Sequence, residues 1–335
     1  MRIAIISDTW HPQINGIVTT LDNTCRVLRN RGHTVKLIDP SSFRTIPCPG
    51  YPHFKLAFLC GPWLRPIIEA FHPDAIHIAT EGPVGFAARR YCLHQGYRFT
   101  TSLHSRYPEY LKLRAGFPLF ISYSYMRWFH SKSERIMVAT PSMRAELATI
   151  GYQRLVHWSR GVDTKLFRPE NKSFIQDKRP ISMYVGRIAI EKNIEAFLRL
   201  EIPGTKYVIG DGPQRELLEQ QYPNVCFTGY QQGQELVNYL AAADVFVFPS
   251  KTDTFGLVLL EALACGVPVA AYPMTGPKDV ITDPRIGTLD NHLQTAVLKS
   301  LTLDPNDCRQ YALKRTWNDT VSQFINYLAL KTPAQ

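Results

Sequence analysis

Short apolar runs alternate along the chain with segments in which apolar residues recur at helical spacing. In the first half, the runs predict strands at Ile3–Ile6, Val35–Ile38, Ala75–Ile78, Phe99–Leu103, Ile136–Ala139 and Leu155–Trp158. The segments between them predict helices at 18–31, 62–71, 83–95, 119–132 and 142–150. Because strands that alternate with helices form parallel sheets covered on both faces, this half is predicted to be an α/β domain.

The second half repeats the alternation. Its predicted strands are Ser182–Val185, Tyr207–Ile209, Val225–Phe227, Val245–Phe248 and Pro268–Tyr272. Its predicted helices are 192–200, 213–221, 232–242, 256–264, 276–282 and 306–329. The polar stretch 168–180, with two prolines, is the expected linker. At 335 residues the chain is too long for one ordinary core and suits two domains of about 150 residues each.

Two acidic residues flank the start of the helix predicted at 256–264. Asp253 and Glu261 are eight positions apart, a little over two helical turns, so they cannot both bind one atom. The backbone between them offers free N–H groups at a helix N-terminus, which suits a phosphate. This spacing favours the two ends of a long ligand with a phosphate in between. The alternative is a capped core helix with two incidental acidic residues.

Cations and a glycine follow two other predicted strands. Arg187 and Lys192 come after the strand at 182–185, and cations at a strand's carboxyl end suit a diphosphate. Solvated surface cations are the alternative. Gly16 follows the first strand, where it lets backbone approach a ligand closely or belongs to an ordinary βα turn.

Together these segments resemble family 4 of the retaining glycosyltransferases, whose GT-B fold has two facing Rossmann-like domains with a cleft between them. The similarity spans nearly the whole chain. It rests on seven segments in the family's order, namely Asp8–Gly16 with Arg31–Val35, Thr101–Tyr110, Ser159–Pro169, Gly186–Lys192, Gly210–Pro213, Phe227–Tyr230 and Asp253–Glu261. One departure is Asp253, which is one methylene shorter than the usual glutamate.

The resemblance implies an acceptor-binding, membrane-facing domain over 1–168 and a nucleotide-sugar domain over 169–305. It also implies a C-terminal segment over 306–335 whose helix crosses back to the first domain. The catalytic residues that it implies are His104, Asp253 and Glu261. The donor-binding residues that it implies are Gly16, Arg187, Lys192, Gly210, Tyr230, Phe255, Gly256, Leu257 and Val258.

Each implied residue has a role in the resemblance. Arg187 and Lys192 bind the diphosphate, Glu261 the ribose hydroxyls and Asp253 the sugar hydroxyls. His104 faces the donor sugar near the reacting carbon, and Tyr230 borders the base. Read without the resemblance, His104 at a strand end is an ordinary structural histidine, and Gly210 belongs to a tight turn.

Charge is unevenly distributed. Residues 1–160 hold 20 Lys and Arg against 9 Asp and Glu, whereas residues 161–335 hold 18 against 19. The excess favours a polyanionic partner for the first half, either an anionic membrane or nucleic acid. Between 112 and 135 aromatic residues interleave with basic ones and only Glu134 is acidic, which suits an interfacial helix. Single-stranded nucleic acid and an ordinary surface helix are the alternatives. The proposed membrane or acceptor residues are Arg114, Arg127, Trp128 and Lys132.

Several patterns are missing from the sequence. No run of about 18 apolar residues predicts a membrane-spanning helix, and the first apolar stretch is too short for a signal peptide. The seven cysteines are scattered without metal-type spacing, which predicts reduced thiols in a cytoplasm. No Gly-x-Gly-x-x-Gly follows the first strand, which excludes a nicotinamide dehydrogenase. No Asp-x-Asp occurs, so neither a cofactor nor an essential metal is expected.

The sequence therefore predicts a retaining hexosyltransferase that uses a UDP-sugar or GDP-mannose. The expected acceptor is a membrane lipid such as diacylglycerol, reached by a protein bound peripherally to the inner face of the cell membrane. A soluble or polysaccharide acceptor is the alternative within enzymes. A basic nucleic-acid-binding protein is the alternative outside them, but no nucleic acid is expected because no binding motif supports it.

Overall fold

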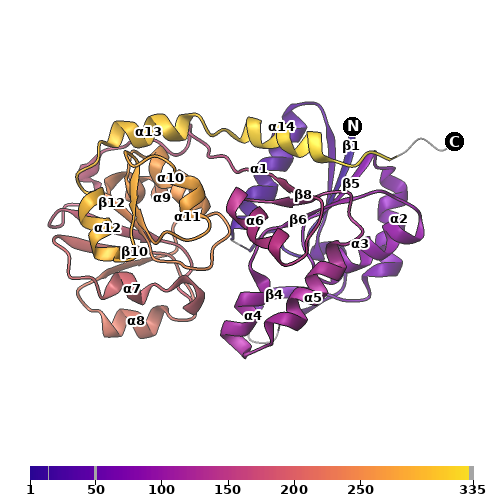
Figure 1. Cartoon of the computed structure of the whole chain (residues 1–335), viewed down its shortest axis with the longest axis horizontal. Helices are drawn as coiled ribbons and strands as arrows, with labels where there is room; N and C mark the ends of the chain where they lie inside the picture. Colours follow the sequence, from indigo (N-terminus) through magenta and orange to yellow (C-terminus); the bar gives the residue numbers. More distant parts are fainter. Residues whose placement is uncertain (14, 49–50, 332–335) are drawn as a thin grey trace. The chain divides into compact units, whose positions relative to one another are not determined.

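The computed structural model of the chain describes residues 1–13, 15–48 and 51–331, which divide into two compact units (Figure 1). Unit 1 comprises Met1–Pro108, Phe117–Ser159 and the chain from Trp317 onward; unit 2 comprises Glu109–Gly116 and Arg160–Thr316. The boundary between Ser159 and Arg160 precedes the polar stretch expected as the linker. Residues before the expected linker already belong to unit 2. Arg309 helps to hold them there, because its guanidinium donates to the carbonyls of Thr164, Phe167 and Ala264.

Unit 1 is built on a parallel sheet in the order β2-β1-β5-β6-β7-β8. Its strands are β1 (Arg2–Ile6), β2 (Thr34–Ile38), β5 (Ala75–Ile78), β6 (Thr100–Leu103), β7 (Ile136–Val138) and β8 (Leu155–His157). Its helices are α1 (Gly16–Asn30), α2 (Cys60–Phe71), α3 (Pro83–His94), α5 (Leu119–His130) and α6 (Pro141–Thr149). The predicted elements of this half are all present, because their apolar runs form the buried strands and the inner faces of the helices.

An antiparallel strand pair and a helix of the first half were not predicted. The antiparallel pair β3 (Thr45–Cys48) and β4 (Tyr51–Ala57) contains prolines in both strands, which weaken a strand signal. Helix α4 (Tyr107–Ala115) follows β6 and has almost no apolar face. Its Pro108 reads as a break, although proline is common in the first turn of a helix.

Unit 2 is built on a second parallel sheet, in the order β11-β10-β9-β12-β13-β14. Its strands are β9 (Ile181–Val185), β10 (Thr205–Ile209), β11 (Cys226–Gly229), β12 (Val245–Phe248), β13 (Val269–Ala271) and β14 (Gly287–Leu289). Its helices are α7 (Glu195–Leu198), α8 (Arg215–Gln221), α9 (Gly233–Ala242), α10 (Leu257–Ala264), α11 (Pro277–Val280), α12 (Leu293–Ser300) and α13 (Pro305–Leu313). Both β14 and α12 were missed, while the parallel α/β architecture predicted for this half is confirmed.

The single helix predicted at 306–329 is wrong. The chain forms α13 and then α14 (Trp317–Tyr327), with a break over Lys314–Thr316. Helix α14 packs within unit 1, where the indole N–H of the fully buried Trp158 donates to the Thr320 carbonyl at 3.1 Å. Phe324 of α14 lies against the same indole, with ring centroids 5.0 Å apart. The break allows α13 to belong to unit 2 and α14 to unit 1.

Asp8 fixes the start of α3 against the ends of β1 and β5. Its carboxylate accepts hydrogen bonds from the Thr80 hydroxyl at 2.8 Å and from the N–H groups of Val84 and Gly85 at 2.7 and 3.2 Å. Burial raises the pKa of Asp8, and these hydrogen bonds offset part of that rise. A Cβ on Gly85 would lie 1.9 Å from the Thr80 carbonyl oxygen, so only glycine permits this approach.

Gly85→Ala should therefore destabilise unit 1 by more than about 2 kcal/mol, because the contacting atom is backbone and cannot swing away. The matched control is Gly61→Ala in α2, where an added Cβ meets nothing within 4 Å. That variant should be neutral or more stable by up to about 1 kcal/mol, because alanine favours a helix. Urea unfolding followed by circular dichroism measures both, and equal stability of the two variants would contradict this packing.

Candidate active site

The strand order of unit 2 reverses beside β9, with β10 and β11 on one side and β12 to β14 on the other. In such sheets the ligand binds at the carboxyl ends of the strands where the order reverses. The loops after β9 and β12 meet there. Lys192 Nζ lies 2.5 Å from Asp253 Oδ1, and the Thr252 hydroxyl donates to the Glu191 carbonyl at 2.9 Å. The Asn193 side-chain amide also joins the two loops, because it donates a hydrogen bond to the Pro249 carbonyl at 3.0 Å.

The Lys192–Asp253 pair is largely shielded, since the two side chains are 22% and 14% exposed. Burial by itself would lower the pKa of Lys192, but the carboxylate of Asp253 outweighs it and raises the pKa. Lys192 therefore stays an ammonium ion. The other oxygen of Asp253, Oδ2, is buried and accepts no hydrogen bond from the described residues. A buried acceptor without a donor is costly, so this oxygen is a candidate to accept a hydrogen bond from a ligand.

The N-cap residue of helix α10, Gly256, makes no side-chain hydrogen bond to the start of the helix. Gly256 precedes it with φ of 83°, a left-handed conformation that glycine adopts without strain. A Cβ on Gly256 would come within 3.0 Å of Leu259 Cδ1 and 3.1 Å of Phe248 Cζ. The N–H groups of Leu257 and Val258 open the helix and have no helical acceptor, so they keep their donor capacity for an anion.

Glu261 is a half-buried carboxyl in α10, and it forms no hydrogen bond or ion pair with the described residues through its side chain. Burial raises its pKa to about 7. Burial, and after it the charge of Glu261, raises the pKa of Tyr230. Tyr230 follows β11 and is 43% exposed. Tyr230 thus lies at the carboxyl end of β11, the sheet edge at which Lys192 and Asp253 also lie, and Glu261 lies on α10, the helix that follows β12.

Three glycines hold neighbouring strand ends together at this edge. The Gly186 N–H donates to the Ile209 carbonyl at 2.9 Å, and the Gly210 N–H donates to the Gly229 carbonyl at 2.8 Å. A Cβ on Gly210 would lie 1.9 Å from the Gly186 oxygen, so close backbone packing alone explains Gly210. Arg187 follows Gly186, half-buried, and its carbonyl accepts a hydrogen bond from the Tyr184 hydroxyl at 2.8 Å.

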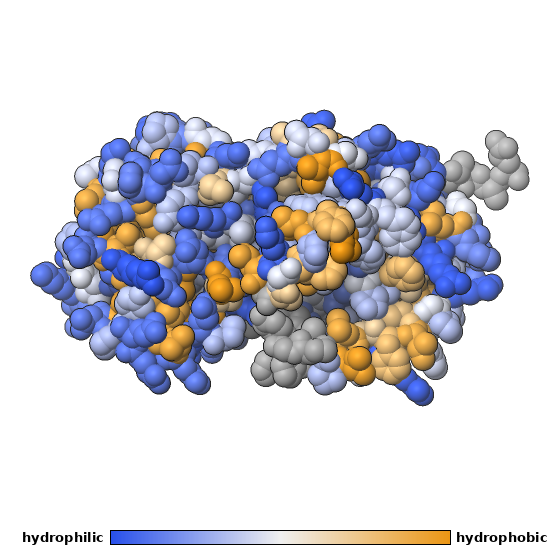
Figure 2. Space-filling view, turned by 60° about the horizontal axis from the view of Figure 1, so that its bottom comes forward, coloured by the Kyte–Doolittle hydropathy of each residue, from blue (hydrophilic) through white to orange (hydrophobic). Residues whose placement is uncertain are grey.

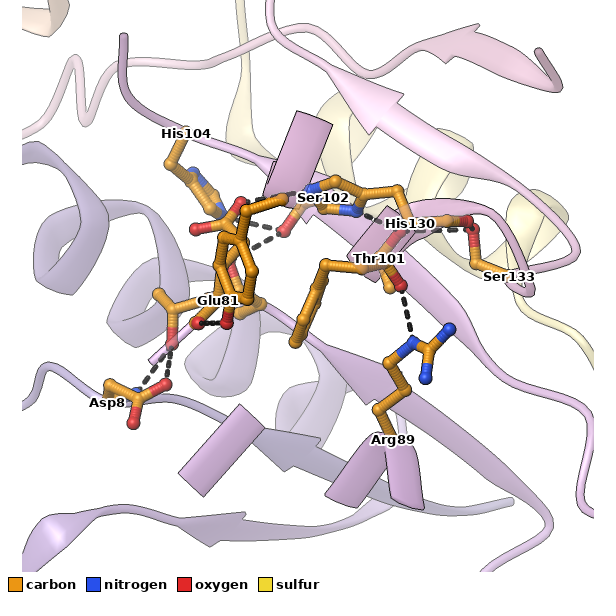
Figure 3. A network of polar contacts seen from close by, with 12 residues as sticks. Asp8, Glu81, Arg89, Thr101, Ser102, His104, His130 and Ser133 are labelled. Atoms are coloured by element: carbon orange, nitrogen blue, oxygen red, sulfur yellow. Dashed lines mark hydrogen bonds and ion pairs between the residues drawn. The ribbon is translucent and has the colours of Figure 1, made fainter. Parts of the chain in front are cut away.

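His104 and Gly16 belong to unit 1. His104 follows β6, and its Nε2 lies 2.8 Å from Ser102 Oγ (Figure 3). The His104 ring also lies edge-on to the Trp158 ring. Gly16 is the first residue of α1, and the preceding Asn15 caps that helix by accepting from the N–H groups of Ile17 and Val18 at 3.0 Å each. Sequence reasoning missed Asn15, although asparagine before an amphipathic run is a known helix-start signal.

The basic and aromatic stretch 112–135 is not one helix. Helix α4 ends at Ala115, Gly116 takes φ of 66°, and α5 begins after Pro118. On α5 the side chains of Phe120 and Trp128 are 72% and 46% exposed. They form, with neighbours, an α5 patch consisting of Phe117, Phe120, Ile121, Tyr125 and Trp128, all of them exposed. Figure 2 shows exposed apolar side chains gathered on the surface of unit 1.

The proposed membrane residues have different surroundings. Trp128 carries the Arg89 guanidinium over its ring at 4.1 Å. Arg127 is exposed, yet it donates to the Ile150 carbonyl at 2.8 Å and to Ser124 Oγ at 3.3 Å, so it also ties α5 to the end of α6. Lys132 is exposed. The side chain of Arg114 lies outside the described part of the structure.

Sequence comparison identifies the family. The model for "Glycosyl transferases group 1" matches residues 168–299, and that for "Glycosyltransferase Family 4" matches residues 14–166. The two matches together span most of the chain, which belongs to these glycosyltransferases. The chain is 29% identical over 320 residues to a GDP-mannose-dependent alpha-mannosyltransferase of Mycobacterium tuberculosis, covering 86% of this chain and 83% of that protein. It is 26% identical to the alpha-monoglucosyldiacylglycerol synthase of Streptococcus pneumoniae, covering 91% and 79%.

Structural comparison gives the same fold. The sucrose-phosphate synthase of Thermosynechococcus elongatus superposes with a TM-score of 0.77 over 97% of each chain, at 21% sequence identity. The chain therefore has the GT-B fold predicted from its sequence, with one parallel α/β sheet in each unit. It is a glycosyltransferase, as predicted.

Among the described residues, no cluster of three or more His, Cys, Asp or Glu side chains has the arrangement of a metal site. No helix in the described ranges has both the length and the apolar character needed to cross a bilayer.

Glu261 should make stability depend on pH. Its pKa is raised from 4.5 to about 7, so between these values the folded state binds a proton that the unfolded state has lost. Its contribution is therefore favourable below pH 4.5, falls as pH rises to 7 and stays low above it. Glu261→Gln removes this pH dependence and should stabilise unit 2 at pH 8. The gain is at most about 3 kcal/mol, and screening of the Glu261 charge by solvent makes it smaller. Thermal unfolding at pH 5 and pH 8 measures it, and an equal gain at both would contradict the raised pKa.

Proposed function

We propose that this protein transfers a hexose, with retention, from a nucleotide sugar to a hydroxyl of a membrane lipid such as diacylglycerol. One observation carries the donor side of this proposal. At the reversal point of the unit 2 sheet, a charged Lys192 is paired with Asp253 just before α10, whose N-cap residue Gly256 forms no side-chain hydrogen bond, and α10 also carries Glu261, whose carboxyl has no partner among the described residues. Cations, free N–H groups and a carboxyl are the groups that recognise diphosphate and ribose.

Each group has a role in the proposed reaction. Lys192, with Arg187, binds the diphosphate, and the N–H groups of Leu257 and Val258 bind the phosphate next to the sugar. Glu261 accepts hydrogen bonds from the ribose hydroxyls, and the free oxygen of Asp253 accepts one from the sugar. As the sugar–phosphate bond breaks, negative charge grows on the diphosphate, so fixed cations and N–H groups stabilise the transition state.

Retention follows if the acceptor hydroxyl attacks the face that the diphosphate leaves, through an oxocarbenium-like state. The acceptor's proton then passes to the departing phosphate oxygen, so no protein carboxylate has to act as a nucleophile. We propose that unit 1 supplies His104 to the sugar and binds the acceptor. No step in this proposal requires a metal ion or a cofactor.

The donor assignment is tested by incubating the protein with UDP-glucose, UDP-glucuronate and GDP-mannose in the presence of dioleoylglycerol in phosphatidylglycerol vesicles. Nucleotide release and glycolipid formation are measured for each donor. Lys192→Ala should lower transfer at subsaturating donor by about 30- to 1000-fold, since it removes a charged contact to the leaving group. Lys178→Ala, an exposed lysine of unit 2, is the control. Near-normal turnover by Lys192→Ala would refute the diphosphate site.

A lipid acceptor is supported by the surface of unit 1 and by the relatives. The α5 patch exposes aromatic and aliphatic side chains beside the cations Arg127 and Lys132. Aromatic side chains enter the headgroup region, while each nearby Lys or Arg contributes about 1 kcal/mol on an anionic surface. The pneumococcal relative is named for glucosyldiacylglycerol synthesis. Peripheral binding to the inner face of the cell membrane is part of this proposal.

Membrane binding should therefore rise with anionic lipid and weaken with salt, because charge attraction is screened over about 8 Å at physiological ionic strength. Sedimentation with phosphatidylglycerol and phosphatidylcholine vesicles measures it. The double variant Phe120→Ser with Lys132→Glu should reduce binding at least about tenfold, since it removes apolar insertion and reverses one charge.

The matched control is Leu217→Ser with Lys178→Glu in unit 2, where Leu217 is 54% exposed. It should bind vesicles as the wild type does. Equal binding of the wild type to neutral and anionic vesicles, or to neither, would contradict the lipid acceptor and favour a soluble one.

A further inference from the structure

Glu81 is a second carboxylate at the edge of the unit 1 sheet where the strand order reverses. That reversal falls between β1 and β5, and Asp8 and Glu81 lie in the loops that follow these two strands. Asp8 already caps α3, with both oxygens accepting hydrogen bonds from Thr80, Val84 and Gly85. Glu81 takes no part in that cap, so its position at a ligand-binding edge is not explained by helix capping.

Glu81 is held from two sides by α5 (Figure 3). Its Oε1 lies 3.1 Å from Nε2 of His130, a side chain that is fully buried, whereas the Glu81 side chain is 18% exposed. The Tyr125 hydroxyl donates to the Glu81 backbone carbonyl at 2.8 Å. One carboxylate oxygen and the backbone are therefore fixed in place.

The hydrogen-bond directions in this network determine where protons lie. The Ser133 hydroxyl donates to the His130 carbonyl at 2.9 Å, and the Thr101 hydroxyl donates to Ser133 Oγ at 3.1 Å. Thr101 has then used its only hydrogen, so its oxygen accepts from Nδ1–H of His130 at 2.9 Å. Since Nε2 and Glu81 Oε1 would repel as two bare acceptors, one proton lies between them.

The pair therefore holds its proton on the inner side of Glu81, whichever of the two groups carries it. The outer oxygen of Glu81, Oε2, accepts no hydrogen bond from the described residues. A carboxylate with one oxygen fixed by a buried histidine and the other free is a preorganised hydrogen-bond acceptor.

We propose that Glu81 binds the acceptor substrate, with its free oxygen accepting a hydrogen bond from an acceptor hydroxyl, and that His130 is a positioning residue for Glu81. The ligand class is a compound with at least one free hydroxyl, such as the glycerol moiety of a lipid. This inference rests on the proposed function, in which unit 1 binds the acceptor.

The test compares KM for the acceptor with affinity for the donor. The probes are dioleoylglycerol in phosphatidylglycerol vesicles for KM, and the sugar nucleotide used by the wild type for calorimetric binding. Glu81→Leu should raise the acceptor KM by about 10- to 100-fold and leave donor affinity unchanged, because the hydrogen bond from the acceptor hydroxyl to the free Glu81 oxygen is lost. Glu134→Leu is the control, since Glu134 is an exposed carboxylate of the same unit paired with Arg98.

Glu81→Gln keeps the test valid if the leucine variant fails to fold. Its amide can donate to Nε2 of His130 and leave an uncharged oxygen outside, so the acceptor KM should rise by about 3- to 10-fold only. His130→Gln should also raise the acceptor KM, and the double variant with Glu81→Leu should be no worse than Glu81→Leu alone, since both act through one contact.

An acceptor KM that is unchanged in both Glu81 variants would overturn the inference, as would a change confined to donor affinity. The wild type could transfer only to a soluble hydroxyl compound. The KM of the Glu81 variants is then measured for that compound, and this result would contradict the lipid acceptor but not the role of Glu81. A wild type that binds no sugar nucleotide would instead overturn the proposed function and this inference with it.

Discussion

The ion pair between Lys192 and Asp253 joins two loops whose residues are 61 positions apart, and the geometry of the unit 2 site depends on it. A shielded ion pair stabilises a fold only when the attraction offsets the cost of removing both charges from water. Here the pair also fixes the loops after β9 and β12 at the point where the strand order reverses. Within the described residues, Asp253 keeps one oxygen without a donor and α10 has no side-chain cap from Gly256, so the contact that orders the loops leaves polar groups that a ligand could use.

The sheet of unit 1 also has a point where the strand order reverses, but the charged side chains there have different roles. The reversal between β1 and β5 again brings two loops together, but there the two carboxylates have separate tasks. Asp8 is fully hydrogen-bonded and locks α3 onto the sheet. Glu81 is bonded on one side only, to a buried histidine. One sheet edge thus contains a carboxylate that stabilises the fold and a neighbouring one that remains available for a ligand.

The site in unit 2 contains groups that lower the stability of the protein when no ligand is bound. Glu261 is a half-buried carboxyl with a raised pKa, one buried oxygen of Asp253 has no donor among the described residues, and the N-cap residue Gly256 gives α10 no side-chain cap. Each of these costs free energy in the protein by itself, and each would be satisfied by a ligand that carries hydroxyls and phosphate. The well-packed parallel sheet beneath them, with β12 entirely buried, supplies the stability that allows these local costs.

The sequence by itself determined the α/β architecture and most of the strands, because buried parallel strands are local apolar runs that can be read directly. It also determined the family, through short segments in a fixed order, and thereby the candidate residues Lys192, Asp253 and Glu261. It did not determine the β3–β4 pair, the break between α13 and α14, or the contact between Glu81 and His130. Those features depend on which residues distant in sequence become neighbours, and on which hydrogen bonds their burial then requires. Only the tertiary structure decides that, since a sequence pattern records spacing along the chain and not distance in space.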